Sequence, residues 1–348
     1  MLRYSLISIK GVVLAGVVCM LCGCTHTLGE EPYENTPAGN MEALWHIIDE
    51  KYCFVEDKGV DWNALHTPYV DSARQIDPTD KQADIMLFDL MARLLNHLHD
   101  GHVNLYTAFD VSNSDEWYKD YPVIYDSRII DDVYLQNARR AGGLTYAKIA
   151  GDSIGYVHYS SFSSTFGVAN MYYVLSSFCD CRGIVLDVRH NGGGDLTNAY
   201  KLASTFMDKD TLVGYWQHKS GKGHNDYSSM EPVYVRQTDM PNKWLRPVVV
   251  LQDRHTYSAA NSFVNAMRYA DNALLLGGLS GGGGGMPMSY ELPNGWMVRF
   301  SSIKMYDADK QSIEEGIEPH VYETLRSSDK DDLIERAVDI INRAYERK

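Results

Sequence analysis

The sequence predicts an α/β fold in which an N-terminal helical subdomain precedes a core built on a mixed sheet. Two short apolar runs, residues 183–188 and 247–252, are typical of buried central strands, and each is followed by a helical pattern. Before them, from Asn40 to about residue 99, apolar residues recur at three- and four-residue spacing, as in helices. The 348 residues, 45% of them hydrophobic, suffice for a large core without disulfide or metal support.

The N-terminus is typical of an export signal. Arg3 and Lys10 accompany apolar residues 11–21, a run shorter than the roughly 20 residues of a spanning helix. Residues 21–24, Leu-Cys-Gly-Cys, resemble the bacterial lipobox, whose last cysteine becomes the lipidated N-terminus. We therefore expect residues 1–23 to be a lipoprotein signal peptide and Cys24 to be lipidated. The protein is expected to be exported to the bacterial cell envelope, in the periplasm or at the outer membrane. A cleaved signal with incidental cysteines is the alternative.

The rest of the chain divides into three stretches. Residues 24–39 are polar, contain two prolines and predict a tether. Residues 40–101 predict a helical subdomain, with helices from Asn40, over 62–73 and after Asp77-Pro78. Residues 102–348 predict the α/β core. Its expected strands are 103–106, 123–125, 133–135, 154–159, 183–188, 247–252 and 274–276, and its expected helices are 196–206, 258–269 and 329–347.

The charge balance excludes one class of partner. A formal net charge of −14 and the lack of a Lys/Arg run argue against a general nucleic-acid binder, which needs cations to replace condensed counterions. We expect no nucleic-acid partner and membrane contact through the lipid anchor alone.

A glycine-rich segment follows the first buried strand. Residues 187–194 read Asp-Val-Arg-His-Asn-Gly-Gly-Gly, which lets the backbone turn sharply and present free N–H groups. Such groups bind a phosphate or stabilise an oxyanion. The segment matches neither the dinucleotide-binding fingerprint nor a P-loop. A glycine turn without function is the alternative.

A serine stands where the second buried strand passes into a helix. Residues 255–261 read His-Thr-Tyr-Ser-Ala-Ala-Asn, so the Ser258 hydroxyl is expected at a helix N-terminus, where the dipole favours negative charge. Serine is also a favoured N-cap, and the spacing alone leaves both interpretations open.

Three histidines and an aspartate mark the passage from the helical subdomain to the core: His97, His99, Asp100 and His102. The pattern is compatible with zinc ligands or with a general base, a role that the ordinary pKa of histidine suits. A solvated helix end that carries histidines is the third interpretation.

Taken in order, these segments resemble the serine peptidases that include the C-terminal processing proteases and the catalytic core of tricorn protease. The matching motifs are L-x-D-G-H at 98–102, D-x-R-x-N-x-G-G at 187–194, T-x-S-A at 256–259 and Gly-Ile-x-Pro at 316–319. The resemblance spans roughly residues 40–325 and implies a ClpP/crotonase-like mixed-sheet fold that acts on peptide or protein substrates. The segment between His102 and the strand near Leu144 is too short for the PDZ module of many relatives, so we expect none.

The resemblance also implies roles for individual residues. Ser258 falls at the nucleophile position, and the amides of Gly193 and Ala259 would form the oxyanion hole, with Gly194 a neighbouring alternative. The processing proteases activate their serine with a lysine in T-x-G-K-G, but residues 278–285 here contain no lysine.

Tricorn-like members use a histidine and an acidic residue instead of that lysine. The histidine falls at His102, and the acidic residue falls at Glu314 or, as an alternative, at Glu315. The serine that precedes the tricorn histidine is Gly101 here, so that helper is missing. We expect the glycine run at 281–285 to be either a mobile flap over the cleft or a plain flexible connection.

The sequence thus predicts an exported, lipid-anchored serine endopeptidase with Ser258 as nucleophile and His102 as general base. No metal and no cofactor are expected. One alternative is a catalytically silent peptide-binding lipoprotein on the same fold. The other is a zinc hydrolase that uses His97, His99 and His102.

Overall fold

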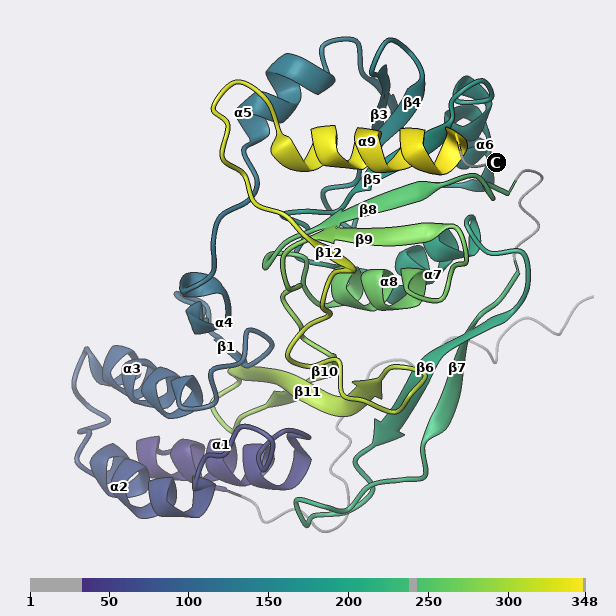
Figure 1. The fold of residues 1–348 in the computed structure, drawn as a ribbon. Coiled ribbons are helices and arrows are strands. Elements are labelled where there is room, and N and C mark those ends of the chain that lie inside the picture. The colour runs from purple at the N-terminus through teal and green to yellow at the C-terminus, as the bar shows by residue number, and fades with distance from the viewer. Residues whose placement is uncertain (1–32, 238–242, 347–348) are drawn as a thin grey trace, which may run out of the picture.

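The computed structural model describes residues 33–237 and 243–346 (Figure 1). The expected signal peptide and Cys24 lie outside the described residues, so their assignment stays a prediction. Within the described ranges, no helix combines the length and the apolarity needed to cross a bilayer.

Three helices form the N-terminal subdomain: α1 (Pro37–Lys51), α2 (Trp62–Arg74) and α3 (Ala83–Asn96). Helix α1 begins three residues earlier than Asn40, because Thr36 is its N-cap and accepts a hydrogen bond from the Gly39 N–H. Asn40 is instead buried and donates its side-chain amide to the Thr36 carbonyl. The predicted tether therefore overlaps the first helical turn.

The helices pack on a small sheet, seen below the centre of Figure 1. Its strands run in the order β1-β11-β6-β7, with β10 also paired to β11. They are β1 (Asn104–Tyr106), β6 (Thr211–His218), β7 (Glu231–Val235), β10 (Gly285–Glu291) and β11 (Met297–Tyr306). Leu44 and Met91 from the helices share one buried cluster with Val298 and Phe300 of β11. The helical subdomain is thus fastened to the strand that crosses the middle of this sheet.

The second, larger sheet has the order β12-β9-β8-β5-β4-β3-β2. Strands β4, β5, β8, β9 and β12 pair in parallel, whereas β3 and β2 are antiparallel, so the predicted mixed-sheet core is confirmed. Its strands are β2 (Arg139–Ala141), β3 (Leu144–Ile149), β4 (Ile154–His158), β5 (Gly183–Asp187), β8 (Val248–Gln252), β9 (Ala273–Gly277) and β12 (Val321–Tyr322).

Helices cover both faces of the large sheet (Figure 1). One face carries α6 (Val168–Ser177), α7 (Leu196–Ser204) and α8 (Ala259–Met267), whose apolar side chains form the largest core cluster. The other face carries α5 (Ser127–Ile129), the π-helical turn η1 (Ile130–Tyr134) and α9 (Asp332–Glu346). The short helix α4 (Glu116–Lys119) follows β1 of the small sheet in the sequence and precedes β2 of the large sheet.

Two predicted strands are wrong. Residues 123–125 have no regular structure, and residues 133–135 fall at the end of η1. Ile130 and Tyr134 of this turn are buried, whereas residues 131–133 between them are all exposed, so the buried side chains follow a helical and not an alternating spacing. The segment between β1 and β3 contains only short helices and the three-residue strand β2, and it holds no PDZ module.

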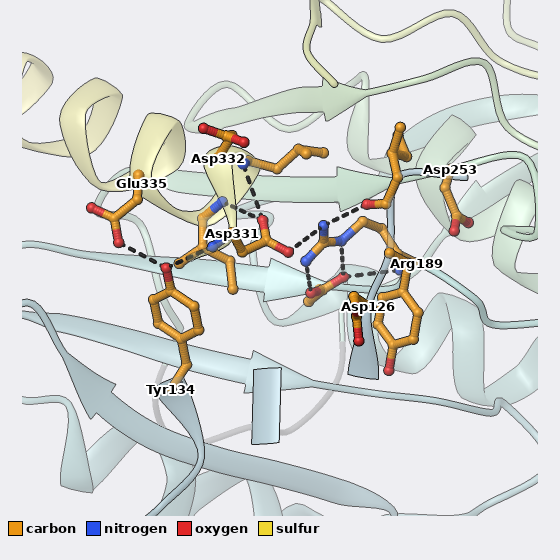
Figure 2. A network of polar contacts seen from close by, with 12 residues as sticks. Asp126, Tyr134, Arg189, Asp253, Asp331, Asp332 and Glu335 are labelled. Atoms are coloured by element: carbon orange, nitrogen blue, oxygen red, sulfur yellow. Dashed lines mark hydrogen bonds and ion pairs between the residues drawn. The ribbon is translucent and has the colours of Figure 1, made fainter. Parts of the chain in front are cut away.

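A buried ion-pair network joins the C-terminal helix to the central strand β5 (Figure 2). The Arg189 guanidinium lies 2.6 Å from an Asp187 oxygen and 2.9 Å from an Asp331 oxygen, and all three side chains are fully buried. Asp331 also accepts the backbone N–H groups of Leu333 and Ile334, so it caps α9. One carboxylate therefore holds both the start of α9 and Arg189, the second residue after β5.

We expect Asp331→Asn to lower the free energy of unfolding by about 1–3 kcal/mol, because the buried Arg189 guanidinium keeps Asp187 as its partner but loses the charged acceptor next to α9. Urea unfolding followed by circular dichroism measures the change. The exposed Asp329→Asn is the matched control and is expected to unfold like the wild type. Equal stability of the two variants would contradict the structural role of the network.

Candidate active site

Ser258 occupies the N-cap position of helix α8, as expected, but its side chain does not cap the helix. Its side chain makes no capping hydrogen bond, and its Oγ lies 3.0 Å from the Nε2 atom of His102. The Ser258 backbone has φ 57° and ψ −122°, a conformation that L-residues rarely adopt. Strained residues of this kind persist where the surroundings over-determine them, often at functional sites. The capping interpretation of Ser258 is therefore wrong.

His102 reaches Ser258 from the turn between α3 and β1. Its ring is buried, with the Nδ1 atom 3.4 Å from the Ser301 Oγ on β11. Burial lowers the pKa of His102 to about 4, although the nearby Asp100 charge acts in the opposite direction. The imidazole is thus neutral at physiological pH, which is the form that can accept a proton.

Asp100 is a buried carboxylate beside His102. It accepts hydrogen bonds from the His102 backbone N–H at 2.7 Å, from the Tyr52 hydroxyl at 2.6 Å and from the Tyr257 hydroxyl at 3.4 Å. Burial, followed by the Asp100 charge, raises the pKa of both tyrosines, so their hydroxyls stay protonated and donate. These donors compensate the burial of the carboxylate charge.

Glu314 lies near this group but is paired elsewhere. Its Oε1 accepts a hydrogen bond from the Lys58 Nζ at 2.9 Å, and its Oε2 is buried without a hydrogen-bond partner among the described residues. Burial, with the Asp100 charge, raises the pKa of Glu314, while Lys58 opposes the rise. In the described part of the chain no hydrogen bond or ion pair joins Glu314 to His102 or Ser258. Its place as the acidic member of the site stays a prediction.

Glu315, the alternative acidic residue, is exposed to 80% at its side chain and lies 3.4 Å from the Lys58 Nζ. Both glutamates line a cavity of about 330 Å³ together with Asp100, Trp117 and Tyr257. Of the two glutamates, the buried Glu314 has the environment that better suits a catalytic carboxylate.

The missing helper serine at Gly101 has a steric explanation. A Cβ atom on Gly101 would lie 2.6 Å from the Trp117 Nε1 atom. Trp117 is held there by stacking on Tyr257, with 4.2 Å between ring centroids. The tryptophan thus fills the space that a serine side chain would need.

The two expected oxyanion donors lie side by side. Gly193 has φ +95°, and a Cβ on it would lie 2.8 Å from the Ala259 nitrogen, so glycine alone fits this approach. Ala259 is the first residue of α8, and its N–H has no intrahelical acceptor. The Gly193 N–H, by contrast, donates to the Asn191 Oδ1 at 2.9 Å. An oxyanion would therefore meet one open donor and one that is already shared.

Hydrogen bonds connect the glycine loop to the loop that carries the serine. The Tyr257 N–H donates to the Asn191 carbonyl at 3.0 Å, and the Thr256 hydroxyl donates to the Val188 carbonyl at 2.9 Å. Strands β5 and β8 are parallel neighbours, so their carboxyl ends meet at one edge of the sheet. The serine and the oxyanion donors are thereby held as one unit.

The glycine run at 281–285 is buried and packed, which fits neither the expected mobile flap nor the plain flexible connection. A Cβ on Gly283 would lie 2.5 Å from the Tyr257 ring, and one on Gly282 would collide with the Glu314 carbonyl. The Ser258 N–H donates to the Gly282 carbonyl at 2.9 Å. The run is glycine-rich because its backbone passes directly against the serine loop.

The structure does not gather the three histidines that suggested zinc. The His97 Nε2 lies 2.9 Å from the Tyr69 hydroxyl, and the exposed His99 pairs with Glu116 at 2.9 Å. His102 faces Ser258. Within the described ranges these residues form no cluster of metal-ligand atoms, so this geometry does not support the zinc-hydrolase alternative.

Ser301 and Asp100 are the neighbours of His102 that the sequence analysis did not assign. Asp100 carried a signal, because it belongs to the L-x-D-G-H motif that identified His102. Ser301 carried none, since it lies in an unpredicted strand and reaches the site only through the pairing of β1 with β11.

Comparison with known proteins identifies the class that this fold and site define. The model of peptidase family S41 matches residues 153–323, and that of the tricorn protease C1 domain matches residues 33–92. A solved structure from Parabacteroides merdae, assigned to the peptidases, is 41% identical with a TM-score of 0.82, over 88% of this chain and 97% of that one. The chain therefore belongs to the S41 family of serine-type peptidases.

More distant relatives agree on the fold. The tricorn protease structure is 13% identical with a TM-score of 0.55, over 88% of this chain and 37% of that chain. The carboxy-terminal processing protease CtpA of Bacillus subtilis is 27% identical over 183 residues, which are 51% of this chain and 36% of CtpA. The chain thus spans about a third of the length of this curated relative.

We expect Ser258→Gly to be more stable than Ser258→Ala by about 1–2 kcal/mol, because glycine adopts the positive φ without strain. Both variants lack the hydroxyl, so the comparison isolates the backbone term. Thermal unfolding of the two proteins measures it. A glycine variant that is no more stable than the alanine variant would show that the backbone at Ser258 is unstrained.

Proposed function

We propose that the protein is an exported, lipid-anchored serine endopeptidase that hydrolyses peptide bonds in peptide or protein substrates through an acyl-enzyme on Ser258. The observation that carries the proposal is the 3.0 Å approach of the Ser258 Oγ to the His102 Nε2, in the absence of a capping bond. A serine hydroxyl is a weak nucleophile until an adjacent base accepts its proton.

In the proposed reaction the neutral His102 takes the Ser258 proton as the oxygen attacks the scissile carbonyl carbon. The resulting oxyanion lies between the N–H groups of Ala259 and Gly193, each worth about 3 kcal/mol in comparable sites. His102 then gives its proton to the leaving amine. In the second half of the reaction His102 takes a proton from water as the water oxygen attacks the acyl-enzyme, and it returns that proton to Ser258.

Ser301 and Asp100 support the base in this proposal. For Nε2 to accept a proton, Nδ1 must carry one, and that Nδ1–H group can donate a hydrogen bond to the Ser301 Oγ at 3.4 Å. The buried Asp100 provides the negative charge that favours the imidazolium formed during the reaction. Both residues are positioning residues, because they act through His102.

The lysine of the processing proteases has no counterpart in this arrangement. Residues 278–285 contain none, and the half-buried Lys58 donates a hydrogen bond to Glu314. Its pKa is raised, since the neighbouring carboxylates outweigh the opposing effect of burial. A lysine held in its charged form is a poor base, so the proton transfer falls to His102.

A serine-directed fluorophosphonate is expected to label Ser258 in the wild type, and peptide mapping identifies the modified residue. His102→Ala is expected to slow labelling at least about 100-fold, since it removes the base. Because burial lowers the pKa of His102 to about 4, labelling should persist at pH 5.5 and be lost only below that range. An ordinary histidine would already be mostly protonated there.

His99→Ala is the matched control, because His99 is exposed, lies near the same turn and, among the described residues, forms an ion pair with Glu116. It should label like the wild type. A folded wild-type protein that takes no label would favour the catalytically silent peptide-binding lipoprotein. Labelling that survives in His102→Ala would assign the base to another group.

The anchor is the part of the proposal that rests on the sequence alone. Mass spectrometry of protein expressed in a bacterial host is expected to find a lipid-modified N-terminal peptide that begins at Cys24. Cys24→Ser should abolish the modification and release the protein from the membrane fraction. A wild-type N-terminus without lipid would contradict the anchor and leave the peptidase assignment untouched.

A further inference from the structure

A group of three side chains that could bind a metal ion lies in the helical subdomain, and none of them is assigned to the active site. Glu42 and His46 are on α1, and His66 is on α2. We propose that these three side chains form a binding site for a divalent transition-metal ion that joins the two helices, with Zn²⁺ as its probe.

The ligand atoms converge on one point. The Nε2 atoms of His66 and His46 lie 2.7 Å and 3.9 Å from the same Glu42 oxygen, Oε2. All three ligand atoms lie within 4.8 Å of one another. Ligands bound tetrahedrally to zinc at about 2.0–2.1 Å lie about 3.3 Å apart. The observed separations bracket this value, so small side-chain rotations would complete the site.

Helix geometry and a tryptophan pair hold the ligands in this arrangement. Glu42 and His46 are four residues apart, which places them on one face of α1. Trp45 of α1 and Trp62 of α2 exchange hydrogen bonds from each indole N–H to the other residue's carbonyl, at 3.0 Å and 3.2 Å. The His66 ring packs edge-on against Trp45, with 4.6 Å between centroids. The scaffold therefore exists before any ion arrives.

The charges around the cluster suit a cation at Oε2. Arg74 approaches the other oxygen of Glu42, Oε1, at 3.8 Å and makes its closer contact with Asp71 at 2.5 Å. Oε2 is thus left to the two imidazoles. Two histidine nitrogens and one carboxylate oxygen form a ligand set that zinc and its neighbours in the first transition row prefer. The three side chains are between 24% and 40% exposed, so water can supply a fourth ligand.

The experiment uses the full chain, purified without a polyhistidine tag and treated with a chelator. Titration with Zn²⁺ in a calorimeter is expected to show one ion bound per chain, with a rise in the thermal unfolding midpoint. Co²⁺ should produce visible absorption bands of a protein-bound ion. His66→Phe keeps a ring against Trp45. The His66→Phe variant and the His46→Phe variant should each bind zinc at least about tenfold more weakly than the wild type.

Two further variants make the result decisive. His97→Phe is the matched control, because His97 belongs to the same subdomain but contacts Tyr69. It should bind zinc like the wild type. Glu42→Gln keeps the size of the side chain and serves where a histidine variant does not fold. No saturable binding by the wild type, or equal binding by the cluster variants, would overturn the proposal and leave the cluster a polar contact between helices. Loss of binding in His97→Phe would do the same.

Discussion

The Arg189 guanidinium is fully buried between two carboxylates, and the rest of the core is arranged around that constraint. It donates to both oxygens of Asp187, at 3.0 Å and 2.6 Å, and to Asp331, which lies 142 positions later in the chain. A buried ion costs several kcal/mol unless it is paired and hydrogen-bonded. Asp187 supplies one of these carboxylates from two residues away, and the segment before α9 supplies the other, Asp331 (Figure 2). The residues that leave β5 at this point are the glycine loop of the site.

The loop that follows Arg189 is hydrogen-bonded to the loop that carries Ser258. The carbonyl of Asn191, two residues on, accepts the Tyr257 N–H, and the Ser258 N–H donates to Gly282, so backbone hydrogen bonds hold both residues where Ser258 has its positive φ. His102 comes from another part of the fold, at the seam where the helical subdomain meets the small sheet. Its distance from Ser258 is therefore set by how the two sheets pack and not by any local sequence. The site depends on the same buried contacts that stabilise the subdomain interface.

This division explains what the sequence could predict. The runs at 183–188 and 247–252 are buried on both faces, so their composition alone identified β5 and β8, and the motif residues after them followed. Strands β6, β7, β10 and β11 alternate buried and exposed residues or lie half-buried, and they gave no continuous apolar signal. With β11 unpredicted, Ser301 had no expected place. The packing of the glycine run could not be predicted from the sequence either, because the run contacts Tyr257 and Glu314, which lie at distant positions in the chain.

The two buried carboxyl groups near the site, those of Asp100 and Glu314, have different charged neighbours. Among the charged neighbours of His102, Asp100 has the largest effect on its pKa, and Asp100 is bound to the His102 backbone N–H. Burial and the same Asp100 charge both raise the pKa of Glu314, because two carboxylates that line one cavity resist ionising together. Lys58 relieves that repulsion by pairing with Glu314. Asp100 thus places a negative charge two residues from His102, whereas Glu314 pairs with Lys58 at the wall of the cavity.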